Sequence, residues 1–187
     1  YPFAIVGCVR CVYETGCTRQ YGAALDLPDG LFGMSWAALL ALAVCGILLS
    51  IALIDAETQT IPDRLNFALA VCGVAGTALS PAGWRGHIIG AVCVSVPMFL
   101  LCLAIDGAFG GGDIKLMAAA GLFLGWQNTL LAMFFGILGG GVYGMYLLAA
   151  YKADKKDHFA FGPFLCAGIV LAMLFGEPVL GWYCQFL

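Results

Sequence analysis

Apolar residues fill most of this chain in long runs that are separated by short polar segments. A helix needs about 20 mostly apolar residues to cross a bilayer, and residues 31–54 supply such a run without a single charge. Further runs, some of them shorter, cover residues 65–79, 87–105, 114–126, 129–151 and 159–183. The pattern therefore predicts a bundle of hydrophobic α-helices.

The first stretch, residues 1–18, is also interpreted as a helix, although Arg10 and Glu14 interrupt it. These charges are four residues apart, so they lie on one helix face and can pair. We predict an all-α fold, a polytopic transmembrane bundle of about six to seven helices. Residues 1–187 are assigned to one membrane domain, in which residues 1–30 form the first helix and an outer loop.

Composition supports lipid as the solvent for this surface. Hydrophobic residues make up 63% of the chain and charged residues only 10%, against about 25% charged residues in soluble domains. The net charge of -3 comes from scattered residues. No basic stripe is present, which argues against nucleic-acid binding.

Basic residues are divided unevenly between the two sides of the predicted bundle. Alternating helices place residues 55–64, 106–114 and 152–158 on one side, and residues 19–30, 80–86 and 127–128 on the other. The first side carries Arg64, Lys115, Lys152, Lys155 and Lys156, and the second carries Arg19 and Arg85. Because cytoplasmic loops are enriched in Lys and Arg, the first side is predicted to be cytoplasmic.

Two aspartates stand at the edges of apolar segments. Asp55 directly follows the first uncharged run, and Asp113 opens the short run over residues 114–126. Ionisable side chains at membrane depth are costly and are usually functional. Either aspartate alone is equally well explained as an interface or capping residue, because aspartate is a good N-cap.

The two aspartates together make a stronger case. Two predicted crossings separate Asp55 from Asp113, and an even number of crossings returns the chain to the same membrane face. Two carboxylates in one site cannot both ionise easily, so they share a proton. The ionised one can take a proton from water while the other hydrogen-bonds a scissile carbonyl. They are therefore the candidate catalytic pair of a hydrolase.

Three consecutive glycines, Gly110, Gly111 and Gly112, precede Asp113. Without β-carbons, they let backbone approach backbone or substrate. Irregular backbone near a membrane is tolerated only where protein buries it or water reaches it. We expect these glycines to form an active-site loop that is ordered by substrate.

Two charged neighbours of the pair have less specific interpretations. Lys115 is a candidate electrostatic neighbour of Asp113, although a lysine that snorkels to the interface is the more common case. Asp63 follows Pro62, a residue that suits a first helical turn. A carboxylate is favourable at that helix end, so Asp63 is interpreted as structural.

Metal ligands are not grouped near either aspartate in the sequence. Cys8 and Cys11 form a single C-x-x-C pair, whereas a structural zinc site usually has four ligands. His87 and His158 fall on opposite sides of the predicted topology. The sequence contains no H-E-x-x-H motif, nucleophile elbow or Walker loop. We therefore expect no metal and no cofactor for the reaction at the aspartates.

Three sequence blocks surround these residues. IDAETQTIPD, at residues 54–63, places an aspartate before an I-P-D turn. GGGDIKL follows at 110–116, and FGPFL opens the last apolar run at 161–165. A lone G-x-G-D is a weak signal, but the three blocks in this order resemble the type IV prepilin peptidases, membrane aspartic proteases of the GxGD kind. The resemblance covers residues 31–183.

This resemblance implies cleavage of the leader peptide of a type IV prepilin or pseudopilin, usually just after a glycine. The reaction would take place at the cytoplasmic face of the bacterial inner membrane, in type IV pilus or type II secretion systems. Asp55 and Asp113 match the family's two catalytic aspartates.

Many family members also methylate the new N-terminus, using a segment with two C-x-x-C pairs upstream of a Tyr-Pro. This sequence begins at the matching Tyr1-Pro2, and Cys8 and Cys11 come after it. Either these residues are a trimmed part of a longer protein that has this segment, or the protein is a peptidase only. We therefore assign no zinc role to the pair and expect no methyltransferase activity from these 187 residues.

Two other functions are compatible with intramembrane carboxylates. An ion or solute carrier also uses broken helices and paired acids, but carriers commonly show internal repeats and none is evident here. A structural subunit of a secretion assembly would have no need for both aspartates. Prepilin cleavage is therefore the preferred hypothesis.

Overall fold

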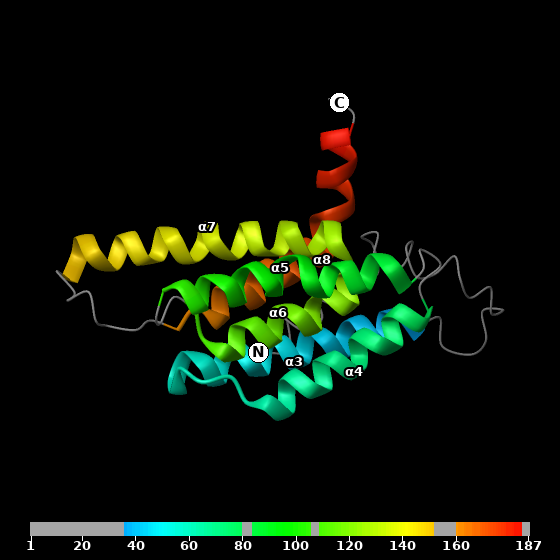
Figure 1. Cartoon of the computed structure of the whole chain (residues 1–187), viewed down its shortest axis with the longest axis horizontal. Coiled ribbons are helices and arrows are strands. Elements are labelled where there is room, and N and C mark those ends of the chain that lie inside the picture. The colour runs from blue at the N-terminus through cyan, green and yellow to red at the C-terminus, as the bar shows by residue number, and fades with distance from the viewer. Residues whose placement is uncertain (1–35, 80–83, 106–108, 152–159, 185–187) are drawn as a thin grey trace, which may run out of the picture.

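The architecture of this protein is helical (Figure 1). The computed structural model describes residues 36–79, 84–105, 109–151 and 160–184. These residues form helices and no strand: α3 (Trp36–Thr58), α4 (Asp63–Leu79), α5 (Trp84–Ala104), α6 (Gly111–Leu124), α7 (Trp126–Tyr151) and α8 (Gly162–Cys184). The predicted all-α fold is confirmed. The helix predicted over residues 1–18 lies outside the described residues.

The helices differ from the apolar runs mainly at their ends. α3 continues through Asp55 to Thr58, so the connection predicted over residues 55–64 is shorter than expected. Near this end, the Thr58 hydroxyl donates to the carbonyl of Ile54 at 2.8 Å. Gln59 then adopts a φ of 52°, a left-handed conformation that commonly ends helices.

The outer surface of the bundle is apolar. Leu53, Phe67 and Leu103 are each at least 60% exposed, together with many other large hydrophobic side chains. Soluble proteins rarely expose apolar surface on this scale. Three helices are long and apolar enough to cross a membrane, over Leu39–Thr58, Trp84–Ala104 and Trp126–Leu147. The described part of the chain is therefore a helical membrane bundle.

α6 lies among four other helices, because it contacts α4, α5, α7 and α8. Its Leu116, Met117 and Ala120 side chains are almost fully buried. Gly121 of α6 lies so close to Gly90 of α5 that a β-carbon on either would overlap backbone of the other helix. Small residues at such contacts allow helices to pack closely. α6 is thereby held inside the bundle.

α8 completes the bundle by packing against α7 and α3. Its first part runs along the bundle, whereas its C-terminal part, coloured red, turns away from it (Figure 1). Pro178 within this helix cannot donate a backbone hydrogen bond, which accounts for such a bend. The packing brings the first turn of α8 to the last turn of α3.

Candidate active site

Asp55 is buried in the last turn of α3, with 5% of its surface exposed. Its Oδ2 accepts a hydrogen bond of 3.0 Å from the backbone N–H of Gly162, the first residue of α8. A hydrogen bond to an ionised acceptor is among the stronger ones in proteins. The end of α3 and the start of α8 therefore meet at this carboxylate.

Gly162 is in contact with the aspartate as well as bonded to it. A β-carbon at Gly162 would overlap Oδ2 of Asp55 and lie 2.9 Å from its Cγ. Any side chain at this position would have to displace the carboxylate or the helix start. The F-G-P block thus has a glycine at position 162 because the carboxylate of Asp55 fills the space that a side chain there would need.

Asp113 is the third residue of α6 and is 7% exposed. Its backbone N–H donates to the carbonyl of Gly110 at 3.1 Å, and Gly110 is the N-cap of the helix. Negative charge is favourable in the first turn of a helix, because the free backbone N–H groups there carry partial positive charge. The helix start therefore suits a carboxylate that is buried here.

The glycines before Asp113 do not form the expected loop. Gly111 and Gly112 belong to α6, and only Gly110 precedes it, so the prediction of a three-residue loop is wrong. Gly112 faces Ile61, where an added β-carbon would come within 2.9 Å of the Ile61 Cβ. Gly111 has open space around it. Close packing, and not a lack of regular structure, therefore distinguishes Gly112.

The structure brings the two aspartates together. The end of α3 and the starts of α6 and α8 lie toward the same end of the bundle (Figure 1). Asp55 and Asp113 are close enough for the charge of one to act on the other. Cys166, one turn after Gly162 in α8, is 3% exposed and lies within reach of both charges. This arrangement is suited to two carboxyl groups that share a proton.

Aromatic side chains tie the two helix starts to each other. Phe109 and Phe161, which lie just before α6 and α8, have ring centroids 5.7 Å apart and planes inclined by 56°. Tilted pairs at this separation are favourable for aromatic rings. A β-carbon on Gly140 of α7 would collide with the Phe161 ring, so α7 packs directly against this ring. The backbone around both aspartates is thereby held in one packed unit.

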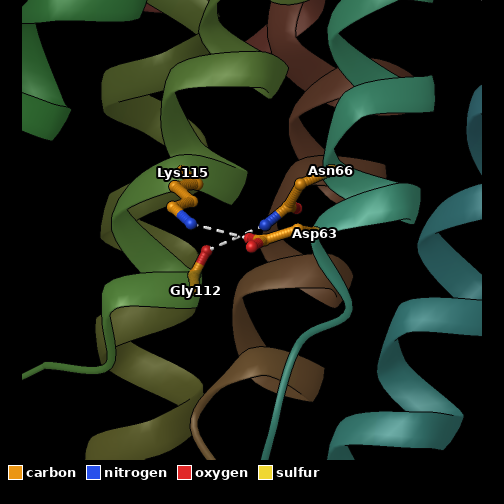
Figure 2. A network of polar contacts seen from close by, with 4 residues as sticks. All are labelled: Asp63, Asn66, Gly112 and Lys115. Carbon is orange, nitrogen blue, oxygen red and sulfur yellow. Dashed lines mark hydrogen bonds and ion pairs between the residues drawn. The ribbon is translucent and has the colours of Figure 1, made fainter.

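Lys115 has a different partner from the one considered. Its ammonium group lies 2.7 Å from Oδ1 of Asp63 in the first turn of α4 (Figure 2). The Lys115 and Asp63 side chains are 59% and 75% exposed. Lys115 is therefore an exposed link between two helices, and its ion-pair partner is Asp63 instead of Asp113.

Asn66 also links α4 to α6 (Figure 2). Its Nδ2 donates to the carbonyl of Gly112 at 3.3 Å, and the residue is 5% exposed. Sequence reasoning missed Asn66, Gly162 and Cys166 as neighbours of the aspartates. A lone amide one turn after Asp63 in an apolar helix was a signal for Asn66, whereas Cys166 resembles any other small apolar residue.

The described residues contain no group of three His, Cys, Asp or Glu side chains that could hold a metal ion. His87 is 2% exposed and its Nδ1 lies 2.9 Å from the carbonyl of Leu122, near the other end of α6. His158, Cys8 and Cys11 lie outside the described residues. A reaction at the aspartates without metal or cofactor stays a prediction.

Comparison with known proteins gives consistent matches. The model of the type IV leader peptidase family (Peptidase_A24) matches residues 42–145, more than half of the chain. One relative, the prepilin leader peptidase/N-methyltransferase of Bacillus subtilis (strain 168), is 29% identical over 82% of this chain and 62% of its own length. Proteins with the same name from Burkholderia pseudomallei (strain 1026b) and Legionella pneumophila are 33% and 31% identical over 79% and 83% of this chain.

The chain spans only 50% to 62% of the length of these relatives. No solved structure matches it significantly. The matched family segment contains both Asp55 and Asp113, the two carboxylates that the fold buries at one end of the bundle. Because the family model matches more than half of the chain, the chain belongs to the type IV leader peptidase family.

Proposed function

We propose that this protein is a membrane aspartic endopeptidase that cleaves the leader peptides of type IV prepilins or pseudopilins. The observation that carries the proposal is the pair of buried carboxylates, Asp55 and Asp113, at one end of the bundle. The names of its relatives, prepilin leader peptidase/N-methyltransferases, support the class of substrate. We assign only the peptidase reaction to the residues described.

In this proposal the two carboxyl groups hold one proton between them. The ionised group takes a proton from the attacking water, and the protonated group donates a hydrogen bond to the scissile carbonyl as charge develops on its oxygen. The N–H of Gly162 holds Oδ2 of Asp55 in place during these steps. Burial of both side chains keeps bulk water from competing for the proton.

The reaction is proposed to take place at the cytoplasmic face of the bacterial inner membrane. The support is the distribution of basic residues, because Arg64 and Lys115 lie at the same end of the described bundle as the aspartates. Lys152, Lys155 and Lys156 are expected on this side as well.

The test is cleavage of a prepilin by the purified protein in lipid nanodiscs. Asp55→Asn and Asp113→Asn are each expected to abolish cleavage and to remain in the membrane at normal levels, because an amide cannot exchange the required proton. Glu57→Gln is the matched control, since Glu57 is an exposed carboxylate on the same helix as Asp55. This variant should cleave normally.

Residual activity of more than a few per cent in either asparagine variant would contradict the catalytic pair. If the wild-type protein cleaved no prepilin but moved a cation across vesicle membranes, the carrier hypothesis would replace the peptidase.

A further inference from the structure

The first turn of α6 is fastened to α4 by residues from one short segment (Figure 2). Asn66 donates from Nδ2 to the carbonyl of Gly112 at 3.3 Å. Ile61, just before α4, packs against Gly112 so closely that the glycine has no room for a β-carbon. Gly112 directly precedes Asp113, so any shift of its peptide group also moves the backbone of the aspartate.

The exposed ion pair beside these contacts contributes little to the fastening. Lys115 and Asp63 are 59% and 75% exposed, and solvent and salt screen such pairs strongly. Asn66 is 5% exposed, and a hydrogen bond in such surroundings is electrostatically stronger than one in water. The amide is therefore the polar contact that can fix the position of Gly112.

Stability alone does not account for an amide at this position. Oδ1 of Asn66 is buried and has no hydrogen-bond partner among the described residues. A buried acceptor without a partner destabilises a fold, and an apolar residue of the same size would avoid that cost. Asn66 donates to the peptide group that joins Gly112 to Asp113, so its side chain can act on the position of the aspartate instead of on stability.

We infer that Asn66 is a positioning residue for the peptidase reaction, because it fixes the first turn of α6 and thus the carboxylate of Asp113. This inference rests on the proposed function. It assigns a role to the segment that begins with the I-P-D residues: residues 61–66 fix the position of the start of α6, and with it Asp113, relative to Asp55. A displacement of about 1 Å in an active site can lower the rate by about 100-fold.

The experiment compares two hydrogen bonds that join the same pair of helices. Asn66→Leu removes the bond beside Asp113. Thr77→Val removes a hydroxyl that lies 2.8 Å from the carbonyl of Leu122, near the far end of α6, and 2.8 Å from the carbonyl of Gly73 in its own helix. kcat and KM are measured with a prepilin in nanodiscs, and amide hydrogen exchange is measured for a peptide covering residues 109–117.

For Asn66→Leu we expect kcat to fall by about 10- to 100-fold and KM to change by less than about twofold. Exchange in the 109–117 peptide should become faster, and the melting temperature should stay at or above that of the wild type. Thr77→Val should keep kcat within about twofold of the wild type. Asn66→Ala, which is smaller, should show the same pattern as Asn66→Leu.

Wild-type kcat in Asn66→Leu would overturn the inference. Equal losses of kcat in Asn66→Leu and Thr77→Val would also overturn it, since the bond would then only hold two helices together. If neither Asn66 variant folds, the residue serves folding and not positioning. Failure of the wild-type protein to cleave any prepilin would instead reject the proposed function, which separates the two hypotheses.

Discussion

The hydrogen bond to Asp55 comes from the backbone of another helix. Gly162 is 107 residues away in the sequence and supplies the N–H at the first position of α8. A backbone donor in a packed helix has little freedom to rotate, so it fixes the carboxylate more firmly than a long side chain would. The same glycine must lack a side chain, because Oδ2 of Asp55 fills that space.

Gly162→Ala is therefore expected to lower kcat for leader cleavage by about 10- to 100-fold, because the methyl group displaces the Asp55 carboxylate. Gly111→Ala is the matched control, since a β-carbon at Gly111 has open space. Cleavage assays at equal protein levels in nanodiscs measure both. Normal kcat in Gly162→Ala would show that this contact does not hold the aspartate.

At the scale of elements, the helix that carries Asp113 begins earlier than its apolar run. Gly111 and Gly112 occupy the first two positions of the helix, although alanine favours helix formation more than glycine does. At Gly112 a glycine is required because Ile61 leaves no room for a larger residue. The G-x-G-D block is thus a packing surface for the segment before α4.

Gly112→Ala is expected to impair cleavage even though both aspartates are intact. Its methyl group would press against Ile61 and push the first turn of α6 outward, with a loss in kcat of about 10-fold. Gly111→Ala again serves as the control, because both substitutions raise helix propensity equally. Unchanged kcat in Gly112→Ala would indicate that the turn can adapt to a larger residue.

The sequence allowed the helices and the aspartates to be predicted, but not the contacts between them. Hydrophobic runs identify α3 to α8 to within a few residues, and two intervening helices place Asp55 and Asp113 at the same end. The boundaries shifted because helices also accept polar residues at their ends, as α3 does at Asp55. Asn66 and Gly162 were missed because their bonds join residues that are 46 and 107 positions apart.

At the scale of the whole molecule, the bundle orients its site relative to the membrane. The turn between α3 and α4 and the start of α6 are expected in the cytoplasm, and the connection between α4 and α5 on the opposite side. Reporter fusions after Thr60 and after Lys155 should be active in the cytoplasm, whereas a fusion at Pro81 should report the periplasm. A periplasmic signal from the Thr60 fusion would invert the proposed orientation of the site.

The molecule is also expected to cleave its substrate without a metal ion. Leader cleavage in excess EDTA should equal that in its absence, because the two carboxylates supply the acid and the base. A loss of activity in EDTA that zinc or another metal restores would require a metal in the mechanism.

α6 is joined to α7 through Gly125 alone, a residue with a φ of 77°. Asp113 lies twelve residues from this joint, which is about 18 Å along a helix. A tilt of the helix by about 3° around Gly125 would move the backbone of Asp113 by about 1 Å, a displacement that can lower the rate of the proposed reaction by about 100-fold. The contacts on the first turn of α6 lie at the end of the helix that such a tilt would move most, so they are placed where they limit it best.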